Sequence, residues 1–325
     1  MKILLTGGSG QVGWELRRVL STQGEVIAPS RDILDLAQPE TIRAAIRASA
    51  PAVIVNAGAY TAVDPAEDEP DTAQAINGIA PGILAEEARR LGAILIHYST
   101  DYVFNGGKDL DGEKPEPYRE SDATHPRCVY GRTKLAGEKA IEAVGGRYLI
   151  LRTSWIYGAR GANFLRTMLR LFREHEVLRI VSDQVGAPTW CRTVAEATGQ
   201  ILALVAASGS ASGSALGSAL GSAQGSAWGD GGKSGGLSGI YHLTAGGRTT
   251  WYDFARAIAE RDPQQEHHRV RKFEPVSTEQ YGAKAKRPLN SRLDCHKIGR
   301  VFGIFPADWL HDLDLVMEEL REGTG

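Results

Sequence analysis

The chain has 325 residues, of which 42% are hydrophobic and 23% charged, which is enough for one large α/β domain with a smaller lobe. Its net charge of -2 gives no reason to expect nucleic acid or an anionic membrane as a partner, and no apolar run could span a bilayer. Three widely spaced cysteines without a Cys-x-x-Cys pair disfavour a disulfide framework and a zinc site, so we expect a reducing, cytoplasmic setting and no bound metal.

Short apolar runs alternate with longer helical patterns through the first half of the chain. Continuously apolar runs are typical of parallel strands that helices cover on both faces. We therefore predict an α/β fold built on a doubly wound parallel sheet, the Rossmann architecture, in which ligands bind beyond the carboxyl ends of the strands. The expected strands are residues 3–6, 26–28, 52–56, 94–99 and 148–152.

The pattern loosens after Trp155, where we expect helices at 163–174, 193–206 and 250–261 and strands at 177–181 and 239–244. Residues 207–238 are mostly Gly, Ser and Ala and cannot supply a core, so we predict a flexible insertion there. The expected division is a Rossmann core of 1–155, completed by parts of about 176–245, and a smaller C-terminal α/β substrate lobe of 156–175 and 246–325.

A glycine-rich turn directly follows the first expected strand. Gly7, Gly10 and Gly13 have Gly-x-x-Gly-x-x-Gly spacing between that strand and a helix. Glycine here permits a tight turn and the close approach of a pyrophosphate to the backbone, while the helix N-terminus supplies amides. The pattern predicts a dinucleotide site that also includes Gln11 and Val12.

The end of the second strand should select the cofactor. An acidic residue there accepts from a ribose 2′-hydroxyl, and a basic residue binds a 2′-phosphate. Ser30 and Arg31 favour NADPH through a charge-assisted contact, whereas Asp32 leaves NADH open. We therefore predict NADPH, with NADH possible, and place further cofactor contacts at Asp35, Leu36, Ala57, Ala59 and Tyr60.

A possible proton-delivery set follows the fourth strand. Tyr130 and Lys134 are four residues apart and so share one face of a helix, where an ammonium can bring the pKa of a phenol toward neutrality. Thr100 ends the fourth strand at the same sheet edge, and its hydroxyl can donate to a carbonyl oxygen that becomes an alkoxide. We predict that all three are catalytic and that Tyr130 and Lys134 also contact the cofactor.

Longer motifs carry a resemblance to a known family. Residues 56–64, 99–104, 152–158, 183–189, 251–255 and 287–294 resemble the dTDP-4-dehydrorhamnose reductases, in the extended branch of the short-chain dehydrogenase/reductase superfamily. The resemblance covers nearly the whole chain except the Gly/Ser/Ala segment. It implies that NADPH reduces the C4 ketone of dTDP-4-dehydro-β-L-rhamnose to give dTDP-L-rhamnose, with Tyr130 protonating the oxygen, Thr100 orienting the ketone and Lys134 holding Tyr130 and the nicotinamide ribose.

The resemblance also assigns residues to a dTDP-sugar substrate. A guanidinium offers a planar fork for phosphate oxygens, and an indole offers area for stacking. Without the family, Trp251 is equally well explained as helix core and Arg287 as a surface charge. The implied site has Asp101 and Tyr102 near the hexose, Trp251, Arg287 and Asn290 nearer the diphosphate and nucleoside, and Trp155 in the same pocket.

One departure concerns assembly. Some members of the family are dimers held by magnesium through interface glutamates, and Glu15 would match one of these. The other two positions have Arg192 and His296, and this set would not bind an ion that prefers oxygen ligands. We expect no magnesium there and either a monomer or a weak homodimer.

Two alternative functions stay open. A sugar-nucleotide epimerase or other reductase of the superfamily would share the cofactor fold, while a dehydratase usually has Glu directly after the Asp of the strand-four motif, where this chain has Tyr102. A non-catalytic NADP-binding regulatory subunit would have little need to keep Thr100, Tyr130 and Lys134 together.

Overall fold

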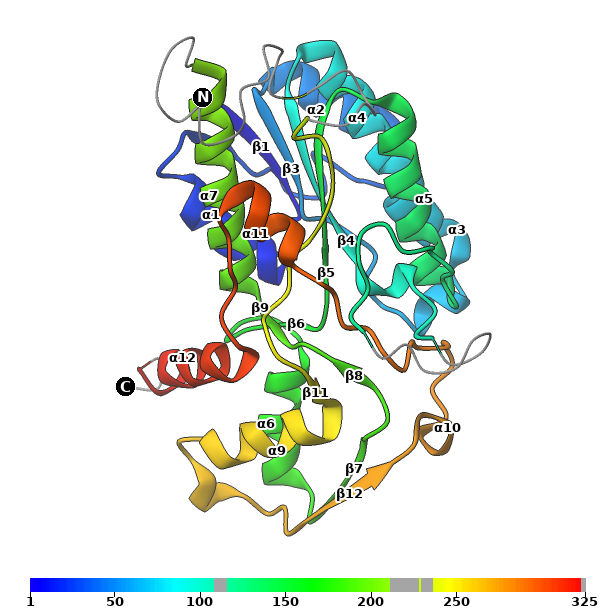
Figure 1. Ribbon diagram of the computed structural model, residues 1–325, viewed down its shortest axis with the longest axis vertical. Coiled ribbons are helices and arrows are strands. Elements are labelled where there is room, and N and C mark those ends of the chain that lie inside the picture. The colour runs from blue at the N-terminus through cyan, green and yellow to red at the C-terminus, as the bar shows by residue number, and fades with distance from the viewer. Residues whose placement is uncertain (108–115, 211–227, 229–235, 323–325) are drawn as a thin grey trace.

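The computed structural model describes residues 1–107, 116–210, 228 and 236–322, and its centre is a sheet of six strands (Figure 1). Every neighbouring pair in this sheet is parallel, which is the predicted doubly wound topology. The strands lie in the order β10 (Gly239–His242), β5 (Arg147–Thr153), β4 (Ile94–Thr100), β3 (Val53–Asn56), β1 (Lys2–Thr6) and β2 (Glu25–Ile27).

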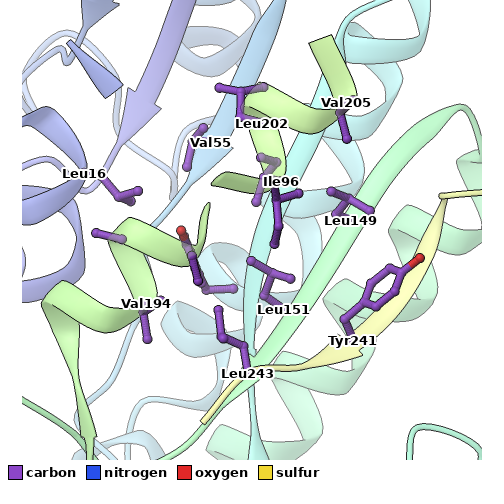
Figure 2. Packing of buried hydrophobic residues seen from close by; sticks show 14 of the residues in the cluster. Leu16, Val55, Ile96, Leu149, Leu151, Val194, Leu202, Val205, Tyr241 and Leu243 are labelled. Atoms are coloured by element: carbon purple, nitrogen blue, oxygen red, sulfur yellow. The ribbon is translucent and has the colours of Figure 1, made fainter. Parts of the chain in front are cut away.

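Helices cover both faces of the sheet, and this explains why the strands are apolar throughout. In β1, Ile3 and Leu5 belong to one core, and Leu4 between them belongs to the core on the opposite face. Figure 2 shows the first core, in which Leu16 and Val194 pack toward the strands. The helices are α1 (Gln11–Leu20), α7 (Cys191–Ser210) and α11 (His296–Phe302) on the first face and α2 (Pro39–Ser49), α4 (Ala80–Leu91) and α5 (Val129–Val144) on the second.

The segment that leads into α4 is not a regular helix. After the 3₁₀ turn η1 (Pro65–Glu67) and the short α3 (Pro70–Ala73), the chain forms a π-helical stretch, η2 (Gln74–Ile79), that continues into α4. A π-helical turn inserts an extra residue and redirects side chains, and such turns occur often at functional sites. Here it buries Asn77 beneath the loop after β3.

A second lobe lies beyond the carboxyl end of β5 (Figure 1) and has a core of its own. Phe172, Phe254 and Leu313 are among its fully buried residues. The lobe contains α6 (Phe164–Glu174), α9 (Trp251–Arg261), α10 (Thr278–Tyr281), α12 (Trp309–Glu322), the 3₁₀ turn η4 (Gln265–His267), and the strand pairs β6 (Ile156–Tyr157) with β9 (Thr189–Trp190), β7 (Val177–Val181) with β12 (Lys272–Val276) and β8 (Val185–Gly186) with β11 (Thr249–Thr250).

No helix in the described ranges, in either the sheet domain or the lobe, is long and apolar enough to cross a membrane.

The strands and helices predicted from the sequence are confirmed within a few residues. The predicted insertion, 207–238, lies largely outside the described residues, although α7 continues to Ser210. The expectation that this segment adds nothing to a core is wrong for Trp228. This residue is 7% exposed and packs in the same core as Ile3 and Leu5. A single indole can fill a core site even between small residues.

Candidate active site

The turn between β1 and α1 brings the backbone close to the loop after β3. Gly7 has a φ of +68°, and a Cβ there would lie 2.5 Å from the nitrogen of Gly58. A Cβ on Gly13 would lie 2.0 Å from the Gly7 oxygen, so neither position tolerates a side chain. Gly10 precedes α1 without a side-chain cap, which leaves the first amides of the helix to a ligand.

A cavity of about 390 Å³ opens beside this turn. The glycine turn forms one wall and the end of β2 forms the other. A cradle of bare backbone amides facing a loop with a guanidinium fits the adenosine half of a phosphorylated dinucleotide. Of the predicted cofactor residues, those that line this cavity are Gly7, Ser30, Arg31, Asp35, Leu36 and Ala59.

Arg17 also lines the cavity, and the sequence did not indicate it. Its Cδ lies 3.5 Å from the position of a Cβ on Gly8, so the side chain runs along the turn. Arg31 forms an ion pair with Asp35 at 3.5 Å, whereas Arg17 forms none among the described residues. Two arginines therefore line the cavity, and one of them is already paired with a carboxylate.

The other predicted cofactor residues are held by neighbouring elements. The Asn163 Nδ2 group donates to Gln11 Oε1 at 3.0 Å, which ties the start of α1 to the lobe. The Tyr60 amide donates to Asn77 Oδ1, and Asn77 Nδ2 donates to the Tyr60 carbonyl, both at 2.9 Å. Asn77 thus fixes the loop after β3, a role that only the fold reveals. The predicted cofactor residues outside the lining of the cavity are Gly10, Gln11, Val12, Gly13, Ala57, Tyr60, Tyr130 and Lys134.

Thr100 and Tyr130 come together at the carboxyl end of β4. Burial raises the pKa of Tyr130 well above its ordinary value, and the neighbouring Thr100 hydroxyl has a smaller, opposite effect. The Tyr102 ring lies edge-on to Tyr130, with centroids 5.4 Å apart, and helps to exclude water. The Tyr130 phenol is therefore a fully protonated group at neutral pH.

Lys134 does not activate Tyr130 in the way that the spacing predicted. Its Nζ donates to the Tyr98 carbonyl at 2.5 Å and lies 3.3 Å from His97 Nε2. Burial lowers the pKa of Lys134 to about 8, with Glu138 opposing the shift. The expected lowering of the Tyr130 pKa is wrong for this arrangement, because burial has the largest effect on the phenol and the Lys134 ammonium is bound at the Tyr98 carbonyl of β4.

Asp101 is a buried carboxyl next to these groups. It is 2% exposed and accepts a hydrogen bond from Thr100 Oγ1 at 2.9 Å, while its Oδ2 atom has no hydrogen-bond partner among the described residues. Burial raises the pKa of Asp101 to about 7, and Thr100 and Ser291 offset only part of this effect. Near neutral pH the carboxyl is partly protonated and can donate as well as accept.

Two predicted substrate residues form an aromatic stack at the start of the lobe. The rings of Trp155 and Trp251 are nearly parallel, with centroids 3.6 Å apart, and Trp251 Nε1 donates to Gln184 Oε1 at 3.2 Å. Trp155 has a φ of +48°, which is strained for a bulky residue. Gly186 permits the stack, because a Cβ there would lie 2.5 Å from the Trp155 ring.

Arg287 reaches the site already bound to a carboxylate. Its Nη1 and Nη2 atoms donate to Asp64 at 3.1 and 2.8 Å, and this pairing lowers the pKa of Asp64. Tyr102 also contributes to holding the Arg287 charge. Asn290 Oδ1 accepts from the backbone and the Nε of Arg292 at 3.2 and 3.1 Å. The structure thus joins Arg287 to Tyr102 and turns Asn290 toward Arg292.

The three residues at the positions of the family's magnesium site form ion pairs with other side chains. Glu15 accepts from Arg18 at 2.9 Å and from Arg192 at 3.2 Å, and Arg192 also donates to Glu319 at 2.9 Å. His296 pairs with Asp294. Within the described ranges, no group of three acidic, His or Cys side chains is placed to hold a metal ion.

A parallel sheet with a nucleotide cavity and a hydroxyl-lined strand end at the same edge is typical of dinucleotide-dependent enzymes of the short-chain dehydrogenase/reductase type. The particular family follows from comparison with known proteins. Residues 1–219 and 228–322 match the RmlD substrate binding domain family, and the chain belongs to it.

Similar proteins cover the chain from end to end. The dTDP-4-dehydrorhamnose reductase of Burkholderia thailandensis is 42% identical over 98% of this chain and 99% of its own, and that of Escherichia coli is 41% identical over 100% and 99%. Among solved structures, the enzyme of that name from Bacillus anthracis, in complex with NADP, is 30% identical with a TM-score of 0.80 over 98% and 99% of the two chains. A UDP-glucose 4-epimerase from Thermotoga maritima, 20% identical with a TM-score of 0.75, covers 100% of both chains and shares the fold.

Proposed function

We propose that this protein reduces the C4 ketone of dTDP-4-dehydro-β-L-rhamnose with NADPH to give dTDP-L-rhamnose. The observation that carries this proposal is the meeting of Thr100 and Tyr130 at the carboxyl end of β4, the same edge of the sheet as the nucleotide cavity, in a chain about 40% identical throughout to reductases of that name. The glycine turn, Ser30 and the two cavity arginines fit NADPH, which supplies a hydride when bound.

The protein contributes the proton and the groups that stabilise and orient the substrate. The Tyr130 phenol, whose pKa burial raises, keeps its proton until the ketone oxygen becomes an alkoxide, which is far more basic than a phenolate. Thr100 donates to Asp101 in the free protein, and its hydroxyl stabilises the same substrate oxygen once it turns to that oxygen as the charge develops. We assign the Lys134 ammonium, which stays charged below its pKa of about 8, to the nicotinamide ribose. We assign Arg287, which Asp64 orients, to the diphosphate of the substrate.

Replacement of the proton donor tests this proposal. We expect Tyr130→Phe to lower kcat/KM at least about 100-fold while NADPH binding persists, because only the acid is removed. The control is Tyr281→Phe, which changes a ring that is 59% exposed on α10 and should leave turnover unchanged. Both are assayed by the substrate-dependent loss of NADPH absorbance. Wild-type protein that binds NADPH yet reduces no dTDP-4-dehydrorhamnose contradicts the proposal.

We further propose that the enzyme acts in the cytoplasm on this small molecule alone, without nucleic acid or membrane, as a monomer or weak homodimer. The near-neutral net charge and the engagement of Glu15 by Arg192 support this. The proposed division assigns cofactor binding to the sheet domain and sugar-nucleotide binding to residues 156–175 and 246–325, in line with the separate core of the lobe. Light scattering across a concentration series tests the assembly.

A further inference from the structure

Behind Lys134 lies a buried chain of polar contacts that the mechanism above does not use. Lys134 Nζ is 3.3 Å from His97 Nε2, and His97 Nδ1 is 2.9 Å from the side-chain amide of Asn56. Asn56 in turn lies 2.6 Å from the Thr6 hydroxyl, to which the Gly58 amide donates at 3.3 Å. The four side chains are at most 2% exposed. These polar contacts therefore connect α5, which carries Lys134, to the glycine turn after β1.

The protonation of His97 follows from its neighbours. Burial, and after it the charge of Lys134, lowers the pKa of His97 far below its ordinary value, so the ring is neutral. A neutral imidazole has one donor and one acceptor nitrogen, and an ammonium only donates. Nε2 must therefore accept from Lys134, and Nδ1 carries the proton. Asn56 then presents its amide oxygen to Nδ1 and its NH2 group to the Thr6 oxygen, so the two amide atoms exchange places and the hydrogen bond between Asn56 and Thr6 reverses its direction.

The opposite tautomer is excluded while Lys134 is charged. A proton on His97 Nε2 would face the ammonium, and this arrangement suits only a neutral amine. The other charged group that acts on Lys134 is Glu138, one turn further along α5. Arg152 of β5 binds both oxygens of Glu138, at 2.9 and 2.6 Å, so that carboxylate is already neutralised. His97 is thus the side chain of the sheet that meets the ammonium directly.

We propose that His97 is a positioning residue whose Nε2 accepts from the Lys134 ammonium and, with the Tyr98 carbonyl, holds that charge in place at the active site. This inference rests on the reductase function proposed above, and His97 acts only through Lys134. If the acceptor is lost, the buried ammonium keeps the Tyr98 carbonyl but loses its side-chain partner. The pKa of Lys134 then falls below about 8, and its charge is lost at a lower pH.

The pH dependence of kcat/KM in two variants tests this. His97→Phe removes the acceptor and keeps the ring volume, whereas His97→Gln can present an amide oxygen to Lys134. We expect the alkaline fall of activity to move down by about one pH unit or more in the Phe variant and to return toward the wild-type position in the Gln variant. His242→Phe, which changes an equally buried histidine on β10, is the control and should not move it. An unshifted profile in the Phe variant overturns the proposal.

A second measurement needs no turnover. The ¹⁵N shifts of the histidine rings report which nitrogen carries a proton, and the signal that disappears in His97→Gln identifies His97. Near neutral pH we expect a protonated Nδ1 and a bare Nε2; a proton on Nε2, or a charged ring, overturns the proposal. Because substrate is absent, this result is independent of the reductase assay. A wild-type protein with the expected tautomer but no turnover would count against the proposed function alone.

Discussion

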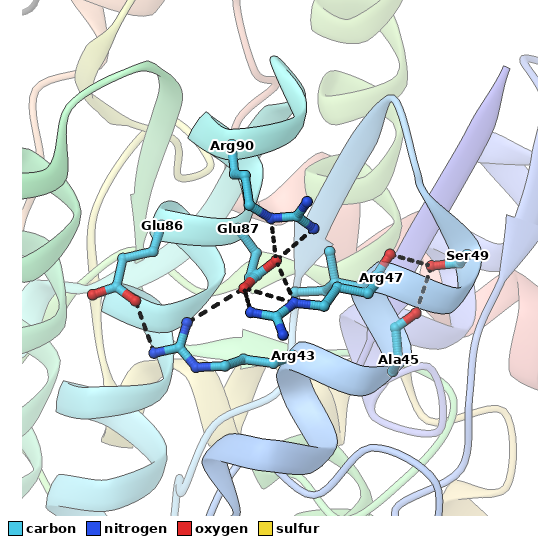
Figure 3. Close-up of polar contacts among 8 residues, drawn as sticks. Arg43, Ala45, Arg47, Ser49, Glu86, Glu87 and Arg90 are labelled. Carbon is cyan, nitrogen blue, oxygen red and sulfur yellow. Dashed lines mark hydrogen bonds and ion pairs between the residues drawn. The ribbon is translucent and has the colours of Figure 1, made fainter.

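Two carboxyl groups of this protein are each 2% exposed, yet they have opposite acidities. Hydrogen bonds from arginine side chains, the largest from Arg47, hold the pKa of Glu87 at about 2. Burial raises the pKa of Asp101 to about 7, and the hydrogen bonds from Thr100 and Ser291 offset only part of this effect. Figure 3 shows the first site, where the partners of Glu87 are Arg43 at 3.4 Å, Arg47 at 2.6 Å and Arg90 at 2.8 Å.

The difference shows that burial alone does not fix the charge of a carboxyl group. Between α2 and α4, half-exposed arginine side chains form ion pairs with Glu87 and compensate for the hydration that this carboxylate loses on burial. At the end of β4 no cation among the described residues acts on Asp101, so this carboxyl can hold a proton near neutral pH. The first arrangement serves stability, and the second leaves a polar group for a substrate to satisfy.

The same chemical change at the two sites should therefore have opposite effects on stability. The largest effect is expected for Glu87→Gln, which should lower the free energy of unfolding at pH 7 by about 2–3 kcal/mol, because three arginines lose their counter-charge. Since the folded pKa is depressed from 4.5 to about 2, this stability is present above pH 4.5 and is lost as the pH falls toward 2. Urea unfolding across that range measures the difference.

The control for this variant is Glu86→Gln. Glu86 lies on α4 next to Glu87 and forms a partly exposed ion pair with Arg43 of α2. We expect a loss below about 0.5 kcal/mol, because exposed pairs are screened by water. Equal losses in the two variants would show that the burial of Glu87 does not increase its contribution to the free energy of unfolding.

Asp101→Asn should instead stabilise the protein at pH 8, by about 1–3 kcal/mol. The folded pKa is raised to about 7 from 3.8, so the stability associated with this group is complete below pH 3.8 and is lost as the pH rises through 7. The gain in the variant should shrink toward pH 4. Activity should fall about tenfold, because an amide cannot replace both forms of the carboxyl. A loss of stability at pH 8 would contradict the interpretation that the charged Asp101 carboxylate has no cation to compensate for its burial among the described residues.

The sequence predicted those parts that depend on local pattern. The apolar run of β1, the glycine turn at Gly7 and the helical spacing of Tyr130 and Lys134 are each confined to a few residues. The pairing of Lys134 with His97 spans 37 residues, and that of Arg287 with Asp64 spans 223. These contacts exist only once the strands are ordered in the sheet. Spacing likewise could not show that Lys134 points toward the Tyr98 carbonyl and leaves burial to set the pKa of Tyr130.

Arg17 extends the comparison to a cation without a carboxylate partner among the described residues. Because its charge is uncompensated, a 2′-phosphate should gain most from it, whereas Asp35 already shares the charge of Arg31. We expect Arg17→Gln to weaken binding of 2′,5′-ADP about tenfold, Arg31→Gln to weaken it less, and neither to change the binding of ADP, as measured by calorimetry. Equal weakening of both nucleotides by Arg17→Gln would mean that the side chain supports the glycine turn and does not select the cofactor.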